Sequence, residues 1–152
     1  MRIYIRGNCD KISNQEIRYA TKFFVSKLVS TRLAKALTLF VVFDRDHDTK
    51  GSCEYLDTND RPREFKIKVK PTLTKPETLK TIAHELVHVK QFARGEMKDY
   101  LFKNAVRWNK QTIFHENVDY WDYPWEIEAF GREIGLYAKY IDHKREHRVT
   151  FI

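Results

Sequence analysis

The sequence predicts an α+β fold in which a small mixed β-sheet packs against helices. Residues 37–43, Leu-Thr-Leu-Phe-Val-Val-Phe, are nearly all apolar and rich in β-favouring residues, which is typical of a central strand buried on both faces. Residues 13–33, 75–94 and 124–142 instead carry apolar side chains at helical spacing. Strands and amphipathic helices in one short chain therefore indicate a sheet with helices packed on it.

The length and charge of the chain limit its organisation and partners. A chain of 152 residues suits one packed core, so we expect a single domain over residues 1–152. Lys and Arg number 28 against 21 Asp and Glu, and this net charge of +7 is spread along the chain. Such a charge is compatible with a nucleic-acid partner, but solubility is the simpler explanation.

The cysteines and the N-terminal segment predict a cytoplasmic protein. Cys9 and Cys53 are too few for a disulfide framework or a Cys-rich metal site. The first residues lack the apolar stretch of a signal peptide, and no apolar run approaches the roughly 20 residues that span a bilayer. We therefore expect a reducing compartment and no membrane contact.

The first part of the chain predicts a short strand followed by a helix. Residues 2–6 are expected to form the strand. Ser13-Asn-Gln-Glu16 is a capping box, which predicts that a helix begins there and continues to about Leu33. Its apolar residues recur at helical spacing, as in a helix that covers one face of a sheet: Ile17, Ala20, Phe24 and Leu28.

A β-hairpin is predicted next. Residues 52–56 and 63–70 flank a run of turn-forming residues, Asp57–Pro62. In the second arm Phe65, Ile67 and Val69 alternate with lysines, so one face is apolar and the other is charged. Lysines often protect a sheet edge from unwanted pairing, which predicts that 63–70 is an edge strand.

The segment after residue 74 predicts a helix that carries metal-binding chemistry. Thr74-Lys-Pro-Glu77 is a capping box, and no Gly follows before residue 95. The helix contains His84-Glu-Leu-Val-His88, the HExxH pattern. Its two histidines lie one turn apart and can bind the same ion, and Glu85 can reach a water on that ion. A helical wheel places both histidines roughly opposite the apolar face, so we expect them to be metal ligands.

A catalytic zinc site needs a third protein ligand from elsewhere in the chain. The extended pattern HExxHxxGxxH is excluded, because Gln91 and Arg94 stand where it requires Gly and His. A third histidine at a looser spacing would be His115. The other source is a glutamate on the following helix.

That helix begins at Pro124 and is expected to run to about residue 142. On a helical wheel Glu126 lies nearer the apolar stripe than Glu128, so Glu126 is the favoured ligand. Glu128 and His115 stay open as alternatives. We expect the stripe to pack on the core: Ile127, Phe130, Ile134, Ala138 and Ile141.

These residues resemble a known family. His84–His88 followed by Trp125–Ala129 is similar to the gluzincin metallopeptidases, and the short chain resembles the minimal minigluzincins. The resemblance implies a zincin-like fold, in which a small mixed sheet packs on an N-terminal helix and the HExxH helix, and a C-terminal helix supplies the third ligand. It also implies one zinc ion per chain, bound by His84, His88 and Glu126. In one departure, Phe130 stands where many gluzincins have Asp.

The resemblance implies a zinc-dependent endopeptidase. Glu85 would act as general base toward a zinc-activated water. Tyr120 and Tyr123, in the aromatic stretch between the two helices, are candidates to stabilise the oxyanion. The substrate peptide would bind in extended form along the edge strand 63–70, whose lysines would favour acidic residues.

Two other functions compete with this one. The chain could be a DNA-associated protease that resembles the SprT-like enzymes, which use a third histidine, and His115 is the residue that would fill that role. It could also be a binding or regulatory module on a metallopeptidase fold. In that case Glu85→Gln would leave its function intact, whereas this change abolishes hydrolysis by an enzyme.

Overall fold

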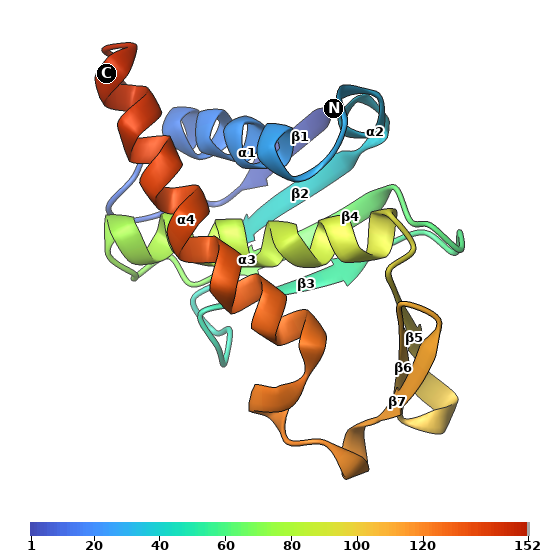
Figure 1. Cartoon of the computed structure of the whole chain (residues 1–152). Coiled ribbons are helices and arrows are strands. Elements are labelled where there is room, and N and C mark those ends of the chain that lie inside the picture. The colour runs from blue at the N-terminus through green and yellow to red at the C-terminus, as the bar shows by residue number, and fades with distance from the viewer. Residues whose placement is uncertain (152) are drawn as a thin grey trace.

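The computed structural model describes residues 1–151 and confirms the α+β class (Figure 1). The main sheet has the order β1-β2-β4-β3, in which β1, β2 and β4 are parallel and β3 is antiparallel to β4. A second, antiparallel sheet has the order β5-β6-β7. The strands are β1 (Arg2–Arg6), β2 (Thr38–Phe43), β3 (Gly51–Tyr55), β4 (Glu64–Val69), β5 (Met97–Tyr100), β6 (Ala105–Trp108) and β7 (Gln111–Phe114).

Four α-helices accompany these sheets within the described residues, and α1 and α3 lie on one face of the main sheet (Figure 1). Helix α4 crosses α3 on the side away from the sheet. The helices are α1 (Asn14–Leu28), α2 (Thr31–Ala36), α3 (Lys75–Ala93) and α4 (Pro124–Glu146), and the 3-10 turns are η1 (Leu101–Lys103), η2 (His115–Asn117) and η3 (Tyr120–Asp122).

Strand β2 is central, as predicted, but only one of its faces is fully covered. Leu39 and Val41 face α1 and α3 and are completely buried. Phe40 points to the other face, where it is partly exposed and stacks on Tyr4 at 5.2 Å. The prediction of burial on both faces was therefore wrong, because aromatic residues rather than helices cover the second face.

The hairpin is confirmed, but the edge strand is β3 and not the segment 63–70. Strand β4 lies between β2 and β3, with Phe65 opposite Leu39 and Ile67 opposite Val41. The alternating lysines lie on the uncovered face, where Lys66 pairs with Glu54 of β3 at 3.2 Å. The alternation therefore reflects a sheet with one open face rather than an edge. The expected preference of residues 63–70 for acidic peptides loses its structural basis.

The N-terminal helix ends earlier than predicted. Ser13 caps α1 by accepting a hydrogen bond from the backbone N–H of Glu16, and α1 ends at Leu28. Ser30 then caps a separate helix, α2, by accepting from the backbone N–H of Leu33. Both cap residues have extended backbone, so the second serine interrupts the helix that the apolar spacing suggested.

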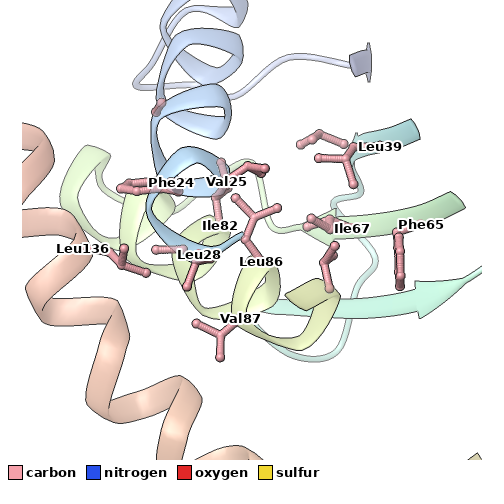
Figure 2. Close-up of a cluster of buried hydrophobic side chains, with 14 of the residues drawn as sticks. Phe24, Val25, Leu28, Leu39, Phe65, Ile67, Ile82, Leu86, Val87 and Leu136 are labelled. Atoms are coloured by element: carbon pink, nitrogen blue, oxygen red, sulfur yellow. The ribbon is translucent and has the colours of Figure 1, made fainter. Parts of the chain in front are cut away.

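The hydrophobic core lies between the main sheet and α3 and extends to α1 and α4 (Figure 2). Ile82 and Leu86 point from α3 toward the strands, and Phe24 reaches the same cluster from α1. Leu136 of α4 is also part of the core. Truncating such a residue to alanine typically costs about 2–5 kcal/mol, so this packing fixes α3 relative to its neighbours.

Helix α4 packs through a different face from the one predicted. Its buried residues are Trp125, Ala129, Leu136 and Tyr140. Tyr140 contacts Phe24 and Phe23 of α1 and donates a hydrogen bond to Glu16, which anchors this face. The predicted core stripe is exposed instead: Ile127, Phe130, Ile134, Ala138 and Ile141. The helix has two apolar faces, and the one with Trp125 and Tyr140 buries the larger aromatic surface.

Two further predictions concern disulfides and membranes. Cys9 and Cys53 are both free, and Cys9 is buried with its thiol 3.4 Å from the carbonyl oxygen of Pro71. Among the helices of residues 1–151, none has the length and apolar character needed to cross a bilayer.

Candidate metal centre

Helix α3 carries His84, Glu85 and His88, as the sequence predicts. The capping box is complete, because Thr74 accepts from the backbone N–H of Glu77 and Glu77 accepts from the backbone N–H of Thr74. The helix that follows spans Lys75–Ala93, close to the predicted range. The imidazole rings of His84 and His88 lie 5.0 Å apart on the side of the helix that faces α4.

Glu126 comes from the first turn of α4 and meets both histidines. Its Oε2 lies 3.1 Å from Nε2 of His84, and its Oε1 lies 3.4 Å from Nε2 of His88. One ligand atom from each of the three residues lies within 4.8 Å of the other two. Two ligands of a tetrahedral zinc ion are separated by about 3.3 Å when each bond is about 2.0 Å. The two His–Glu separations are close to this value, although they involve different oxygens of Glu126, so the group could hold a metal ion.

The second ring nitrogen of each histidine also has a partner. Nδ1 of His84 lies 2.8 Å from Oε2 of Glu133, and Nδ1 of His88 lies 2.8 Å from Oε1 of Gln91. Gln91 in turn donates to the carbonyl oxygen of Trp125 and to Glu128. Partners of this kind fix the orientation and tautomer of metal-binding histidines.

The role of Glu133 was not predicted from the sequence. Phe130 stands four residues after Glu126, and its ring packs edge-on against the ring of His84, with centroids 4.6 Å apart. Glu133, one turn further along α4, supplies the carboxylate that contacts His84. The available signal was its spacing from Glu126, since residues seven apart share one face of a helix.

Glu128 and His115, the two alternative ligands, lie outside the three-residue group. Glu128 accepts hydrogen bonds from Lys90 at 2.7 Å and Gln91 at 2.9 Å, and it also pairs with Arg132. Nδ1 of His115 lies 3.2 Å from the hydroxyl oxygen of Tyr123. The structure therefore gives both residues other partners.

A cavity of about 430 Å³ opens beside His84 and Glu85. It lies between the start of β3, helix α3 and the N-terminal half of α4. Gly51 lets β3 approach the site closely, because a Cβ there would lie 3.2 Å from Oε1 of Glu85. The cavity is lined by Thr49, Lys50, Gly51, Glu77, Lys80, Thr81, His84, Glu85, Tyr120, Phe130 and Glu133.

The charges in this site favour a bound cation. Burial raises the pKa of Glu126, but hydrogen bonds from His84 and His88 outweigh it and lower the pKa to about 2. Burial lowers the pKa of both histidines, but their carboxylate neighbours outweigh it, so both values are raised. Burial is the main cause that raises the pKa of Glu85. Three glutamates, including Glu133, surround two imidazoles, and a bound metal ion would replace protons on these groups.

The two candidate tyrosines lie in different surroundings. Tyr120 lines the cavity, and its pKa is raised to about 12 by burial and by the charge and hydrogen bonding of Glu126. Tyr123 stacks on Trp125 with ring centroids 4.7 Å apart, and its hydroxyl group lies against His115. Tyr120 is therefore the tyrosine that faces the cleft.

Comparisons with known proteins do not assign a function to this site. No protein-family model, no curated protein and no solved structure matches the chain. The side chains that meet between α3 and α4 are therefore the basis for inferring a function.

Proposed function

We propose that the chain is a zinc-dependent endopeptidase of the gluzincin type. The observation that carries this proposal is the meeting of His84, His88 and Glu126 beside a cleft that is lined by His84 and Glu85. Two imidazoles and one carboxylate are the ligand set of several catalytic zinc sites, which keep a fourth position open for water. The oriented histidines support the same function, because Glu133 and Gln91 hold their other nitrogens.

A bound zinc ion would supply Lewis acidity toward the scissile carbonyl and lower the pKa of a bound water to about 7. His84, His88 and Glu126 would hold this ion. The donor set suits zinc, since imidazole is a common zinc ligand and the three-residue arrangement leaves one position free.

Glu85 would act as the general base. It is buried in the cleft wall, and the charges of His84, His88 and Glu126 act on its carboxylate, which supports a position near the proposed metal. Its raised pKa brings it closer to the working pH, which favours proton transfer in both directions. Glu85 would take a proton from the attacking water and pass it to the leaving amine.

Tyr120 would stabilise the oxyanion. Its hydroxyl group is a neutral donor at ordinary pH, and the raised pKa of about 12 keeps it protonated over a still wider range. A donor aimed at the developing negative charge in a partly dry cleft typically accelerates such reactions by about 10²–10³.

The free edge of β3 would bind the substrate backbone. Within residues 1–151, strand β3 pairs only with β4, so its other edge has unpaired backbone groups. The strand begins at Gly51, beside Glu85, which places this edge next to the proposed catalytic centre. An extended peptide can add to such an edge through main-chain hydrogen bonds.

Hydrolysis by a Glu85→Gln variant tests this proposal. Wild type, Glu85→Gln and the control Glu146→Gln are loaded with zinc, and cleavage of fluorescently labelled, unfolded casein is followed. We expect cleavage by wild type and the control, and a loss of at least about 100-fold in Glu85→Gln with one zinc ion still bound. Equal cleavage by Glu85→Gln, or none by zinc-loaded wild type, would contradict the proposal.

A further inference from the structure

Arginine side chains gather at the C-terminal end of α3, in a region that shares no residue with the cavity beside His84. Two adjoining hollows of about 480 and 360 Å³ lie there, and both are lined by Arg61 and Arg94. We call this region the arginine groove, and define it by Arg32, Arg61, Arg63, Arg94, Arg107 and Lys110. It contains five of the 12 arginines in the chain.

The groove is assembled from segments that are distant in the sequence. Arg32 comes from α2, Arg61 from the connection between β3 and β4, and Arg94 from the end of α3. Figure 1 shows these three segments gathered on one side of the molecule. Arg107 of β6 and Lys110 of the β6–β7 turn extend the groove along the second sheet. The fold itself therefore concentrates positive charge that is dispersed in the sequence.

Most of this charge has no acidic partner within residues 1–151. Glu96 is the one carboxylate that lines the hollows. It lies 3.4 Å from Arg94, but it also pairs at 2.7 Å with the buried Lys90. Asp60, near Arg107, pairs with Lys98 at 2.5 Å. The groove thus keeps a large excess of positive charge.

Backbone contacts fix the shape of the groove. Arg63 donates to the carbonyl oxygens of Arg61, Pro62 and Ala93, at 3.0, 3.0 and 2.8 Å, and so ties the β3–β4 connection to the end of α3. Arg61 lies against Gly95, where an added Cβ would be 2.9 Å from its Nε. Gly95 has a φ of +73°, so the close approach and the backbone both favour glycine there.

We propose that the arginine groove binds the phosphodiester backbone of nucleic acid. Guanidinium groups match phosphate oxygens in a bidentate geometry and are less strongly hydrated than lysine ammonium groups. A series of cations along two hollows suits a ligand with repeated charges better than one phosphate ion. None of the described residues that line the hollows is aromatic, so the groove offers no surface for base stacking. Binding should therefore be independent of base sequence.

Fluorescence anisotropy with labelled oligonucleotides tests this inference. The probes are a 20-nucleotide single strand and a 20-base-pair duplex, each in two unrelated sequences. We expect a Kd of about 1–100 μM at physiological salt, equal for both sequences, with an affinity that falls steeply as salt rises. Absence of binding to either probe at 50 mM salt would overturn the proposal.

Charge-reversal variants locate the binding surface. The double change Arg61→Glu and Arg94→Glu should weaken binding at least tenfold. Lys11→Glu with Lys22→Glu changes the net charge equally at two exposed residues outside the groove, and should weaken binding less than threefold. Equal losses would show a general effect of net charge and contradict the proposal. If the first variant does not fold, Arg32→Glu with Arg107→Glu makes the same test.

Competition distinguishes other anions. Unlabelled duplex should displace the probe, whereas polyglutamate and 10 mM inorganic phosphate at constant ionic strength should displace little of it. Displacement by polyglutamate as efficient as by duplex would indicate a site for acidic proteins. Displacement by phosphate alone would indicate a site for a single anion. Either result would overturn the proposal.

Discussion

Glu133 lies with its Oε2 2.8 Å from Nδ1 of His84, two helical turns beyond Glu126 on the same helix. Glu126 approaches Nε2 of the same ring at 3.1 Å, so the two carboxylates hold His84 from both sides. Helix α4 therefore supplies both a proposed metal ligand and the group that orients another ligand. This double contact ties His84 to the position of α4.

Replacing Glu133 should weaken metal binding without abolishing it. The Glu133→Gln variant loses the negative charge beside His84, and the loss of such an orienting partner typically costs about 10–100-fold in metal affinity. Competition with a zinc-binding dye measures this affinity, with Glu146→Gln as a control at an exposed glutamate of the same helix. An unchanged zinc affinity in Glu133→Gln would mean that the contact does not support the site.

Tyr120→Phe should slow hydrolysis while the metal stays bound. If the hydroxyl group stabilises the oxyanion, its removal lowers kcat by about 10²–10³. Tyr123→Phe is the matched control, because its hydroxyl group contacts His115 and does not face the cleft. Steady-state kinetics on a cleaved peptide separate kcat from KM. Equal effects of the two substitutions would remove the proposed role of Tyr120.

Gly51→Ala should damage both stability and activity. The added Cβ would lie 2.5 Å from Cγ2 of Thr81 and 3.1 Å from the carbonyl oxygen of Lys68, so β3 or α3 must move. Overpacking of this kind typically costs about 1–3 kcal/mol. Gly131→Ala is the control, since no atom lies within 4 Å of a Cβ at this exposed helical position. It should stabilise the fold by about 0.5–1 kcal/mol. Urea denaturation measures the stability of both variants. A Gly51→Ala variant as stable as wild type would refute the close approach of β3.

Glu16 should make stability depend on pH. It is buried between α1, α3 and α4, where it pairs with Lys75 and Lys144 at 2.6 Å each and accepts from Tyr140. Burial raises the pKa of Glu16, but the two lysines outweigh it and lower the pKa below its ordinary value of 4.5. Its stabilising effect is therefore complete above pH 4.5 and is lost as the pH falls through the lower, folded-state value.

The Glu16→Gln variant isolates this effect. At pH 7 it should be about 2 kcal/mol less stable than wild type, because a hydrogen-bonded charged group is removed. The difference should shrink as the pH falls below 4.5 and through the lower folded-state pKa of Glu16, where the wild-type carboxylate also takes up a proton. Urea denaturation at several pH values measures it. A difference that stays constant with pH would contradict the ion-pair account.

The sequence predicted those features that depend on neighbouring residues. The capping box at Thr74 and Glu77 and the i, i+4 spacing of His84 and His88 are local patterns, and the structure contains both. Glu126 was favoured because of its angle to an apolar stripe on a helical wheel. The structure brings Glu126 to the histidines although that stripe is exposed.

The missed features depend on how distant segments pack. Helix α4 has two apolar faces, and periodicity alone does not show which one meets the core. The local sequence does not show the order of strands in the sheet. The lysines of β4 therefore suggested an edge strand, whereas β4 lies inside the sheet and β3 lies at its edge. Glu133 was missed for the same reason, since its role exists only because α4 crosses α3 at His84.

Metal content of purified variants tests the central claim most directly. Wild type, Glu126→Ala, Glu128→Ala and His115→Ala are reconstituted with zinc, dialysed and measured by elemental analysis. A site formed by His84, His88 and Glu126 predicts about one zinc ion per chain in wild type, Glu128→Ala and His115→Ala, and a large loss only in Glu126→Ala. Wild type without bound zinc, or Glu126→Ala that retains a full equivalent, would contradict the proposed metal centre.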